Sequence, residues 1–295
     1  MKLIRDPKKF QAEMERLRKK GRAIGFVPTM GALHEGHLSL VRAARRENDV
    51  VAVSIFVNPL QFGPKEDLKK YPRTLKEDRR LLEEAKADYL FPPSPAAMYP
   101  EGFKTVIDAG GESLSKVLCG KFRPGHFRGV CTVAAKLFNL AKPDRVYFGA
   151  KDYQQAAILR RMILDLNTGI EFRLMPTVRE KDGLAMSSRN RYLSPEERRR
   201  ALGLSRILFW MRSQIKGGER DILRLKRAGL ARLKTAVDRV DYLEIVDPET
   251  LESLRKFQPR MVIAAACFAG KTRLIDNVII RNFKEHRGTR APSHQ

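Results

Sequence analysis

The sequence is poor in cysteine. Three cysteines, Cys119, Cys131 and Cys267, occur among 295 residues and stand far apart in the chain. A disulfide framework, or a zinc site built on paired cysteines, needs more of them at closer spacing. We therefore expect three buried, reduced thiols, which is the usual state in a reducing compartment.

Long apolar runs are also missing. Nowhere do about 18 uncharged apolar residues follow one another, which is the length that a membrane helix requires. The first nine residues carry four Lys or Arg and no apolar run of signal-peptide length. The sequence thus predicts a soluble protein that stays in the cytoplasm and has no membrane partner.

Acidic residues are scarce relative to basic ones. The chain has 58 Lys and Arg against 34 Asp and Glu, a net charge of +24 and a pI near 10.3. The densest basic stretch, 198–239, also contains acids and sets its charges among Leu and Ile at helical spacing. This pattern is typical of solvated helix faces that favour anionic ligands. Nucleic-acid binding is kept as the less favoured interpretation.

Strand-like and helix-like segments alternate over about the first 175 residues. Apolar, β-branched runs such as 49–57 are typical of strands buried on both faces. The alternation predicts an α/β fold with a doubly wound, Rossmann-like parallel sheet that binds ligands at the carboxyl ends of its strands. The predicted order is strand 23–29, helix 36–47, strand 49–57, helix 75–87, strand 89–91, helix 130–140, strand 146–148, helix 152–166 and strand 171–178.

The character of the sequence changes after Asp182-Gly183. Ser194 followed by Pro195 is typical of a helix start, and helices are predicted from there to about residue 215 and over 221–237. Three apolar runs, at 242–246, 261–268 and 274–280, predict strands. We thus predict a Rossmann-like ligand-binding domain (1–178), a smaller α+β C-terminal domain (179–283) and a tail (284–295) without order.

The first candidate site follows the first predicted strand and reads Met30-Gly31-Ala32-Leu33-His34-Glu35-Gly36-His37. Two imidazoles at a helix N-terminus, together with backbone N–H groups, favour an anion such as a polyphosphate. The glycines let the backbone approach a ligand closely. The second histidine comes one place too early for an HExxH zinc motif, so no residue is assigned as a metal ligand. A metal pair or two ordinary loop histidines remain alternatives.

Two further segments carry hydroxyls and cations. Met186-Ser187-Ser188-Arg189-Asn190 suits a clamp on terminal phosphates, or else a polar loop that caps the next helix. Gly149-Ala150-Lys151-Asp152 opens a predicted helix at a strand end. Lys151 can neutralise a phosphate there, and Asp152 can hold ribose hydroxyls or a magnesium ion; a capped helix with a surface lysine is the alternative.

Two glutamines complete the candidate site. Gln155 lies one helical turn beyond Lys151 and can bind a small polar substrate. Gln61 stands at the end of the second predicted strand, at the same edge of the sheet. A fifth segment, Ala269-Gly270-Lys271-Thr272, lacks the first glycine and the helix of a P-loop, and therefore predicts a hairpin turn.

Six motifs, in this order, resemble the signatures of the pantothenate synthetase family: PTMGALHEGH (28–37), FVNPLQF (56–62), YPRT (71–74), RPGHFRGV (123–130), FGAKDYQQ (148–155) and REKDGLAMSSRN (179–190). The resemblance covers about residues 1–282. It implies a homodimeric ligase that condenses pantoate with β-alanine, using ATP and Mg²⁺, and that releases AMP and pyrophosphate by way of a pantoyl adenylate. The HxGH and MSSR elements also resemble the paired signatures of nucleotidylyltransferases and class I aminoacyl-tRNA synthetases.

The resemblance also implies roles for individual residues. It assigns ATP binding to 30–37, 149–152 and 186–189, with the backbone of Val178 at the adenine. Gln61 and Gln155 would hold pantoate, with Gln61 also near β-alanine. Ala150 stands where the family usually has Glu or Gln, which removes any contact through that side chain. The residues implied in catalysis are His34, His37 as the acid, Lys151, Ser187, Ser188 and Arg189.

Two other functions stay open at this point. A nucleotidylyltransferase would stop at the nucleotidylated product, and a basic nucleic-acid-binding protein would not use the ATP motifs. The loop 182–190 lies between the two predicted domains. Because an acyl adenylate must be kept from water, we expect the C-terminal domain to act as a lid, with Gly183 as its hinge.

Overall fold

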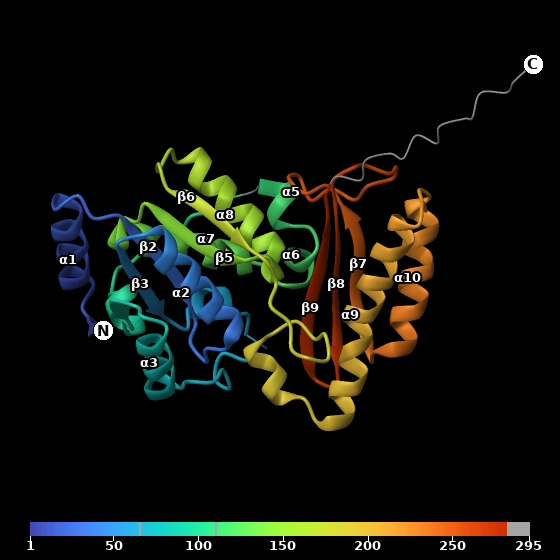
Figure 1. The fold of residues 1–295 in the computed structure, drawn as a ribbon, viewed down its shortest axis with the longest axis horizontal. Helices are drawn as coiled ribbons and strands as arrows, with labels where there is room; N and C mark the ends of the chain where they lie inside the picture. The colour runs from blue at the N-terminus through green and yellow to red at the C-terminus, as the bar shows by residue number, and fades with distance from the viewer. Residues whose placement is uncertain (65, 110, 282–295) are drawn as a thin grey trace, which may run out of the picture.

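The computed structural model describes residues 1–64, 66–109 and 111–281, which form a six-stranded and a three-stranded sheet (Figure 1). All pairs in the larger sheet are parallel, in the order β1-β4-β3-β2-β5-β6. From β2 the chain first winds outward through β3 and β4 and later returns to place β5 on the other side. The predicted doubly wound sheet is thus confirmed. Its strands are β1 Lys2–Leu3, β2 Ile24–Thr29, β3 Val50–Ile55, β4 Tyr89–Phe91, β5 Arg145–Gly149 and β6 Glu171–Met175.

Helices cover both faces of the parallel sheet. Helices α1 (Pro7–Lys19), α7 (His126–Ala141) and α8 (Tyr153–Asp165) pack on one face, and α2 (Glu35–Glu47) and α3 (Leu75–Glu84) on the other. Along β3, Val50 and Ala52 face the first group while Val51 and Val53 face the second. Burial on both faces is why this strand is a continuous apolar run.

Several elements were not predicted from the sequence. Helix α1 begins with Asp6, whose side chain accepts from the Lys9 N–H at 2.8 Å, and Pro7 follows at the first helical position. Edge strand β1 has only two residues, too few for a pattern. The short helices are η1 Pro59–Gln61, α4 Pro95–Met98, α5 Gly111–Ser115, α6 Cys119–Phe122, η2 Ala150–Asp152 and η3 Ser188–Tyr192.

The second half contains two helices and an antiparallel sheet, as predicted. Helices α9 (Pro195–Lys216) and α10 (Ile222–Ala236) cover one face of β7 (Arg239–Val246), β8 (Met261–Ala269) and β9 (Thr272–Ile280). The other face packs against the larger sheet's helices, so the small sheet lies between the two groups of helices (Figure 1). Ala269 pairs with Thr272, which confirms the hairpin turn.

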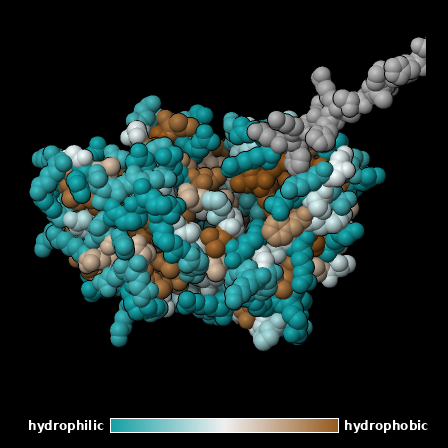
Figure 2. Space-filling view, in the orientation of Figure 1, coloured by the Kyte–Doolittle hydropathy of each residue, from teal (hydrophilic) through white to brown (hydrophobic). Residues whose placement is uncertain are grey.

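The predicted domain limits and the lid role of residues 179–283 stay predictions. The predicted tail at 284–295 falls outside the described residues. The three cysteines are buried thiols, as the composition indicates. In the described ranges no helix combines the length and apolarity needed to cross a bilayer. Hydrophilic residues dominate the visible surface, and apolar residues gather in its middle, between the parts that carry the two sheets (Figure 2).

Candidate active site

The loop between β2 and α2, residues 30–34, is held by a buried carboxylate from α3. Asp78 is 1% exposed and accepts from the N–H groups of Ala32 at 3.0 Å and Leu33 at 2.8 Å. Gly31 and Ala32 have left-handed backbones, with φ of 84° and 49°. For alanine this conformation costs about 1 kcal/mol, which the two hydrogen bonds offset. Sequence reasoning missed Asp78, although it stands one turn before buried Leu82 on the same helix face.

The two imidazoles of this segment contact each other at the start of α2, with their ring planes tilted by 37°. Their ring centres are 4.1 Å apart, and the His34 N–H donates to Nδ1 of His37 at 3.4 Å. In the neutral ring, Nε2 of His37 therefore carries the proton and is a donor. A Cβ on Gly36 would lie 2.9 Å from Cε1 of His34, so a larger residue here would force that ring to move.

Both histidines are held neutral at pH 7. Burial, reinforced by the nearby Lys151, lowers the pKa of His34 to about 4. Burial, together with His34 and Lys151, lowers the pKa of His37 well below 6.5. The pair thus offers hydrogen bonds to an anion without a permanent positive charge.

The turn that presents Lys151 is tied to the small sheet. Asn277 of β9 donates from Nδ2 to the carbonyl oxygens of Ala150 at 2.8 Å and Lys151 at 2.9 Å. The Lys151 side chain is 20% exposed, and its Nζ lies 3.7 Å from Oδ2 of Asp152, which is 49% exposed. Ala150 is buried. Sequence reasoning missed Asn277; its only signal was the polar pair Asp276-Asn277 inside an apolar run.

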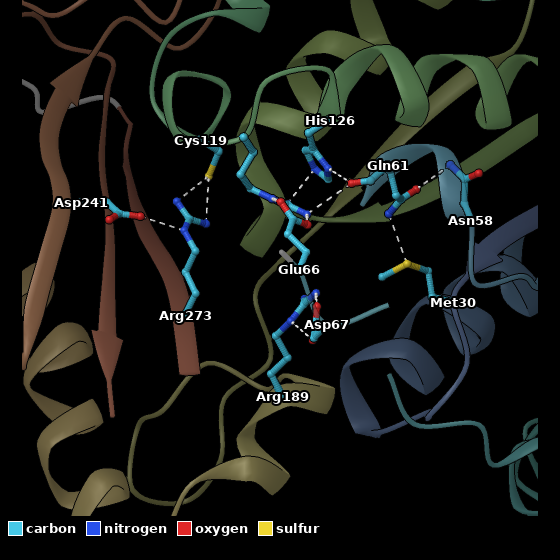
Figure 3. Close-up of polar contacts among 11 residues, drawn as sticks. Met30, Asn58, Gln61, Glu66, Asp67, Cys119, His126, Arg189, Asp241 and Arg273 are labelled. Atoms are coloured by element: carbon cyan, nitrogen blue, oxygen red, sulfur yellow. Dashed lines mark hydrogen bonds and ion pairs between the residues drawn. The ribbon is translucent and has the colours of Figure 1, made fainter. Parts of the chain in front are cut away.

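The loop 186–189 reaches back to the first segment. Ser188 donates from Oγ to the Ala32 carbonyl at 3.0 Å, and Ser187 caps the turn by accepting from the Arg189 N–H at 3.3 Å. Arg189 forms a two-pronged ion pair with Asp67, with both N–O distances at 2.9 Å (Figure 3). A phosphate that binds Arg189 must therefore share the guanidinium group with Asp67 or displace the Asp67 carboxylate.

The same loop is anchored at its base. The Met186 N–H donates to the Val178 carbonyl at 3.0 Å, so one acceptor position of the predicted adenine contact is already in use. Arg179 pairs with Asp276 of β9 through contacts of 2.6 and 2.9 Å. The loop therefore links the parallel sheet to the small sheet.

The two glutamines selected from the sequence have different surroundings. Gln61 in η1 is buried; its Oε1 accepts from Nδ2 of Asn58 at 3.0 Å, and its Nε2 lies 3.2 Å from Sδ of Met30 (Figure 3). A thioether is a weak acceptor, so a ligand oxygen could replace it. Gln155 is partly buried in the first turn of α8. Its neighbour Gln154 is a structural residue that bonds to the backbone around α6.

A cavity of about 1300 Å³ lies beside these segments. The residues that line it include Lys151, Asp152, Ser187 and Arg189, and also Arg273 of β9. Gln61 lines a separate hollow of about 240 Å³. In the described part of the chain the two histidines and Gln155 line neither space. The structure thus brings the lysine and the serine–arginine loop together at one cavity, whereas Gln61, Gln155 and the two histidines are not among the residues that line it.

The residues present fit a magnesium ion only as a partner of phosphates. Among the described residues, no group of three or more His, Cys, Asp or Glu side chains is placed to hold a metal. Mg²⁺ is commonly bound by one or two carboxylates together with substrate phosphates. Asp152, half exposed at the cavity, meets that requirement.

The buried side chain of His126 predicts a loss of stability in mild acid. Burial, with Arg123 beside the ring, lowers the pKa of His126 to about 4, against about 6.5 in an unfolded chain. Between these values the unfolded chain binds the proton more readily, so the free energy of unfolding falls as pH falls from about 6.5 toward 4. We expect His126 to contribute a loss of about 2 kcal/mol between pH 7 and 5. Urea denaturation at both pH values measures it, and an equal pH dependence in His126→Asn would contradict it.

The parallel-sheet fold, with polar segments at the carboxyl ends of its strands, defines a nucleotide-binding α/β protein. The profile of the family described as Pantoate-beta-alanine ligase matches residues 2–279. The pantothenate synthetase of Fervidobacterium nodosum is 56% identical over 272 residues, which cover 91% of this chain and 96% of that protein. The chain belongs to the pantoate-beta-alanine ligase family.

Solved structures agree with this membership. A crystal structure of pantothenate synthetase from Thermus thermophilus has a TM-score of 0.91 at 48% identity and covers 96% of this chain and 100% of that one. The pantoate-beta-alanine ligase from Francisella tularensis, complexed with beta-gamma ATP and beta-alanine, has a TM-score of 0.78 at 35% identity, with coverage of 95% and 97%. The family predicted from the six motifs is therefore confirmed, while the roles of single residues stay predictions.

Proposed function

We propose that this protein condenses pantoate with β-alanine in an ATP-dependent reaction that yields pantothenate. The observation that carries the proposal is the family match over residues 2–279. A relative of the same fold was crystallised with beta-gamma ATP and beta-alanine, which supports both as ligands here. The cavity beside Lys151 and Arg189 supports a polyphosphate substrate.

The reaction proceeds in two steps. A carboxylate oxygen of pantoate attacks the α-phosphorus of ATP, the bond from that phosphorus to the pyrophosphate oxygen breaks, and pantoyl adenylate forms. The neutral amine of β-alanine then attacks the acyl carbon, the bond to AMP breaks, and the amine nitrogen loses a proton. No covalent enzyme intermediate is needed, so the residues act by positioning and by stabilising charge.

Each segment has a proposed part in this chemistry. Residues 30–37, 149–152, 186–189 and the Val178 backbone surround ATP. Lys151 and Arg189 stabilise negative charge on the triphosphate, and His37 donates from Nε2. Gln61 and Gln155 orient pantoate.

Asp152 would hold Mg²⁺ together with phosphate oxygens, and the ion would neutralise charge on the triphosphate. A homodimer and a cytoplasmic location remain proposals from the sequence.

A pyrophosphate-release assay tests the function. With ATP and pantoate alone, we expect about one pyrophosphate per site, because the adenylate stays bound; β-alanine should give continuous turnover with equal amounts of AMP and pantothenate. Continuous release without the amine would instead indicate a nucleotidylyltransferase. A gel shift with DNA or RNA that survives physiological salt, in a protein without ligase activity, would favour the nucleic-acid alternative.

A further inference from the structure

No ligand-binding role is proposed above for residues 123–130. Arg123, His126 and Gly129 of this segment nevertheless contact Gln61 or its neighbours in η1. His126, the first residue of α7, is 9% exposed. Its Nδ1 lies 2.8 Å from the carbonyl oxygen of Gln61, and its Nε2 lies 2.9 Å from Nη1 of Arg123 (Figure 3). An arginine can only donate, so Nε2 must accept, and Nδ1 carries the proton that is donated to Gln61. The contacts therefore select one neutral tautomer.

Arg123 is itself oriented by a carboxylate. Its Nε and Nη2 donate to Glu66 at 2.8 and 2.5 Å, and Nη2 also lies 3.4 Å from the Gln61 carbonyl. The two-pronged contact restricts the guanidinium plane in a way that a single lysine contact would not. Glu66, Arg123 and His126 thus form a chain of hydrogen bonds that ends on the backbone of Gln61.

Helix α7 also holds the side chain of Gln61. A Cβ on Gly129 would lie 2.2 Å from the Leu60 carbonyl oxygen, so the helix packs directly on η1 because this position is glycine. The Gly129 carbonyl accepts from Nδ2 of Asn58 at 3.1 Å, and the same nitrogen donates to Oε1 of Gln61 at 3.0 Å. The start of α7 therefore controls both the backbone and the amide of Gln61.

The short helix η1 needs this support. The backbone hydrogen bonds within its turn are long. The nitrogen of Gln61 lies 3.5 Å from the carbonyl oxygen of Asn58, and the nitrogen of Phe62 lies 3.3 Å from the carbonyl oxygen of Pro59. Hydrogen bonds of this length hold a three-residue helix weakly. The orientation of Gln61 must come from its neighbours.

We propose that Arg123 and His126 are positioning residues, which fix Gln61 in the orientation that binds pantoate. The inference rests on the proposed function, because it takes pantoate as the ligand of Gln61. Neither residue needs to touch the substrate. Loss of the contact to the Gln61 carbonyl should weaken pantoate binding and leave ATP binding unchanged.

Three variants of His126 separate positioning from packing. The amide nitrogen of Asn lies near the place of Nδ1, so His126→Asn can still donate to Gln61. The longer His126→Gln reaches the place of Nε2 and keeps only the contact with Arg123, and His126→Ala loses both. We expect KM for pantoate to rise about tenfold or more in the Gln and Ala variants and less than about threefold in the Asn variant. KM for ATP should change by less than about twofold in all three.

Arg123→Lys provides a second test that does not open a cavity in the core. It keeps the charge beside Glu66 but loses the fork, so KM for pantoate should rise by an intermediate factor at unchanged KM for ATP. Tyr147→Phe is the matched control: it removes a buried hydroxyl bonded to Asn48 at 2.7 Å and Glu47 at 3.0 Å in a cluster on the opposite face of the sheet. It should lower the melting temperature without moving either KM.

Three results would overturn the inference: an unchanged KM for pantoate in His126→Gln and Arg123→Lys, an equal rise for both substrates, or an Asn variant as impaired as the Ala variant. A wild-type protein that released no pyrophosphate with pantoate would instead refute the proposed function, and the inference with it. Activity of the wild type in the same assay therefore distinguishes the two failures.

Discussion

Lys151→Ala is expected to slow pyrophosphate release from ATP and pantoate by about a hundredfold or more. Lys151 lines the cavity and lies on a turn held by Asn277, so we expect its ammonium group to meet a bound triphosphate without rearrangement. Attack of a carboxylate on a phosphate joins two anions, and a preplaced positive charge lowers that barrier. Stopped-flow measurement of pyrophosphate release measures the first step alone.

Lys142→Ala is the matched control for this variant. Lys142 is also a partly exposed lysine with one carboxylate partner, Glu15 at 2.5 Å, but it lies at the end of α7 beside α1. Its removal should leave the rate within about twofold, because exposed ion pairs contribute little. A Lys151→Ala variant that is folded and turns over at the wild-type rate would refute the role of Lys151 in charge stabilisation.

His37→Ala should lose about a hundredfold in the same step, whereas His37→Gln should retain much more activity. The reason is the proton position: Nδ1 of His37 accepts from the His34 N–H, so Nε2 is the donor, and the amide nitrogen of Gln lies near that place. Both variants are compared with the wild type under saturating ATP and pantoate. Equal losses in the two variants would show that a hydrogen-bond donor at this position is not what matters.

The pH profile provides an independent check on His37. Burial and the neighbouring Lys151 keep its pKa well below 6.5, so this imidazole stays neutral across pH 6 to 8. The rate of the first step, plotted against pH, should therefore show no inflection near pH 6.5 that is caused by His37, that is, none that is present in the wild type and absent from His37→Gln. Such an inflection would instead indicate a protonated imidazole acting as a general acid.

The elements that the sequence predicts well are those with a repeating local pattern. Strand β4 falls at the predicted residues, and the limits of α9 and α10 lie within one residue of those predicted, because a Ser-Pro start, an Asp cap and a helical repeat are all local signals. The short helices were missed because one or two turns are too short for periodicity. Helix α1 has 13 residues and did carry local signals, an Asp6-Pro7 start and buried residues at helical spacing, which sequence reasoning overlooked.

The candidate site likewise contains residues that the sequence indicates and residues that it does not. Lys151, Ser187 and Arg189 were selected from the sequence and do line one cavity. The residues that hold them in place, such as Asp67 and Asn277, were not selected. Asp67 is 122 positions from Arg189 in the chain, and Asn277 is 126 from Lys151, so nothing in a local window connects them.

By itself, the sequence determined the family, the alternation of buried strands with helices, and the segments suited to phosphate at the strand ends. These depend on periodicity, turn residues and helix starts, which act over a few neighbouring residues. Only the tertiary structure decided that Asp78 shapes the first loop, that Arg189 rests on Asp67, and that Arg123 and His126 support Gln61. Hydrogen bonds between distant side chains form only when packing brings the two groups within about 3 Å in the correct orientation, and that placement depends on the whole fold.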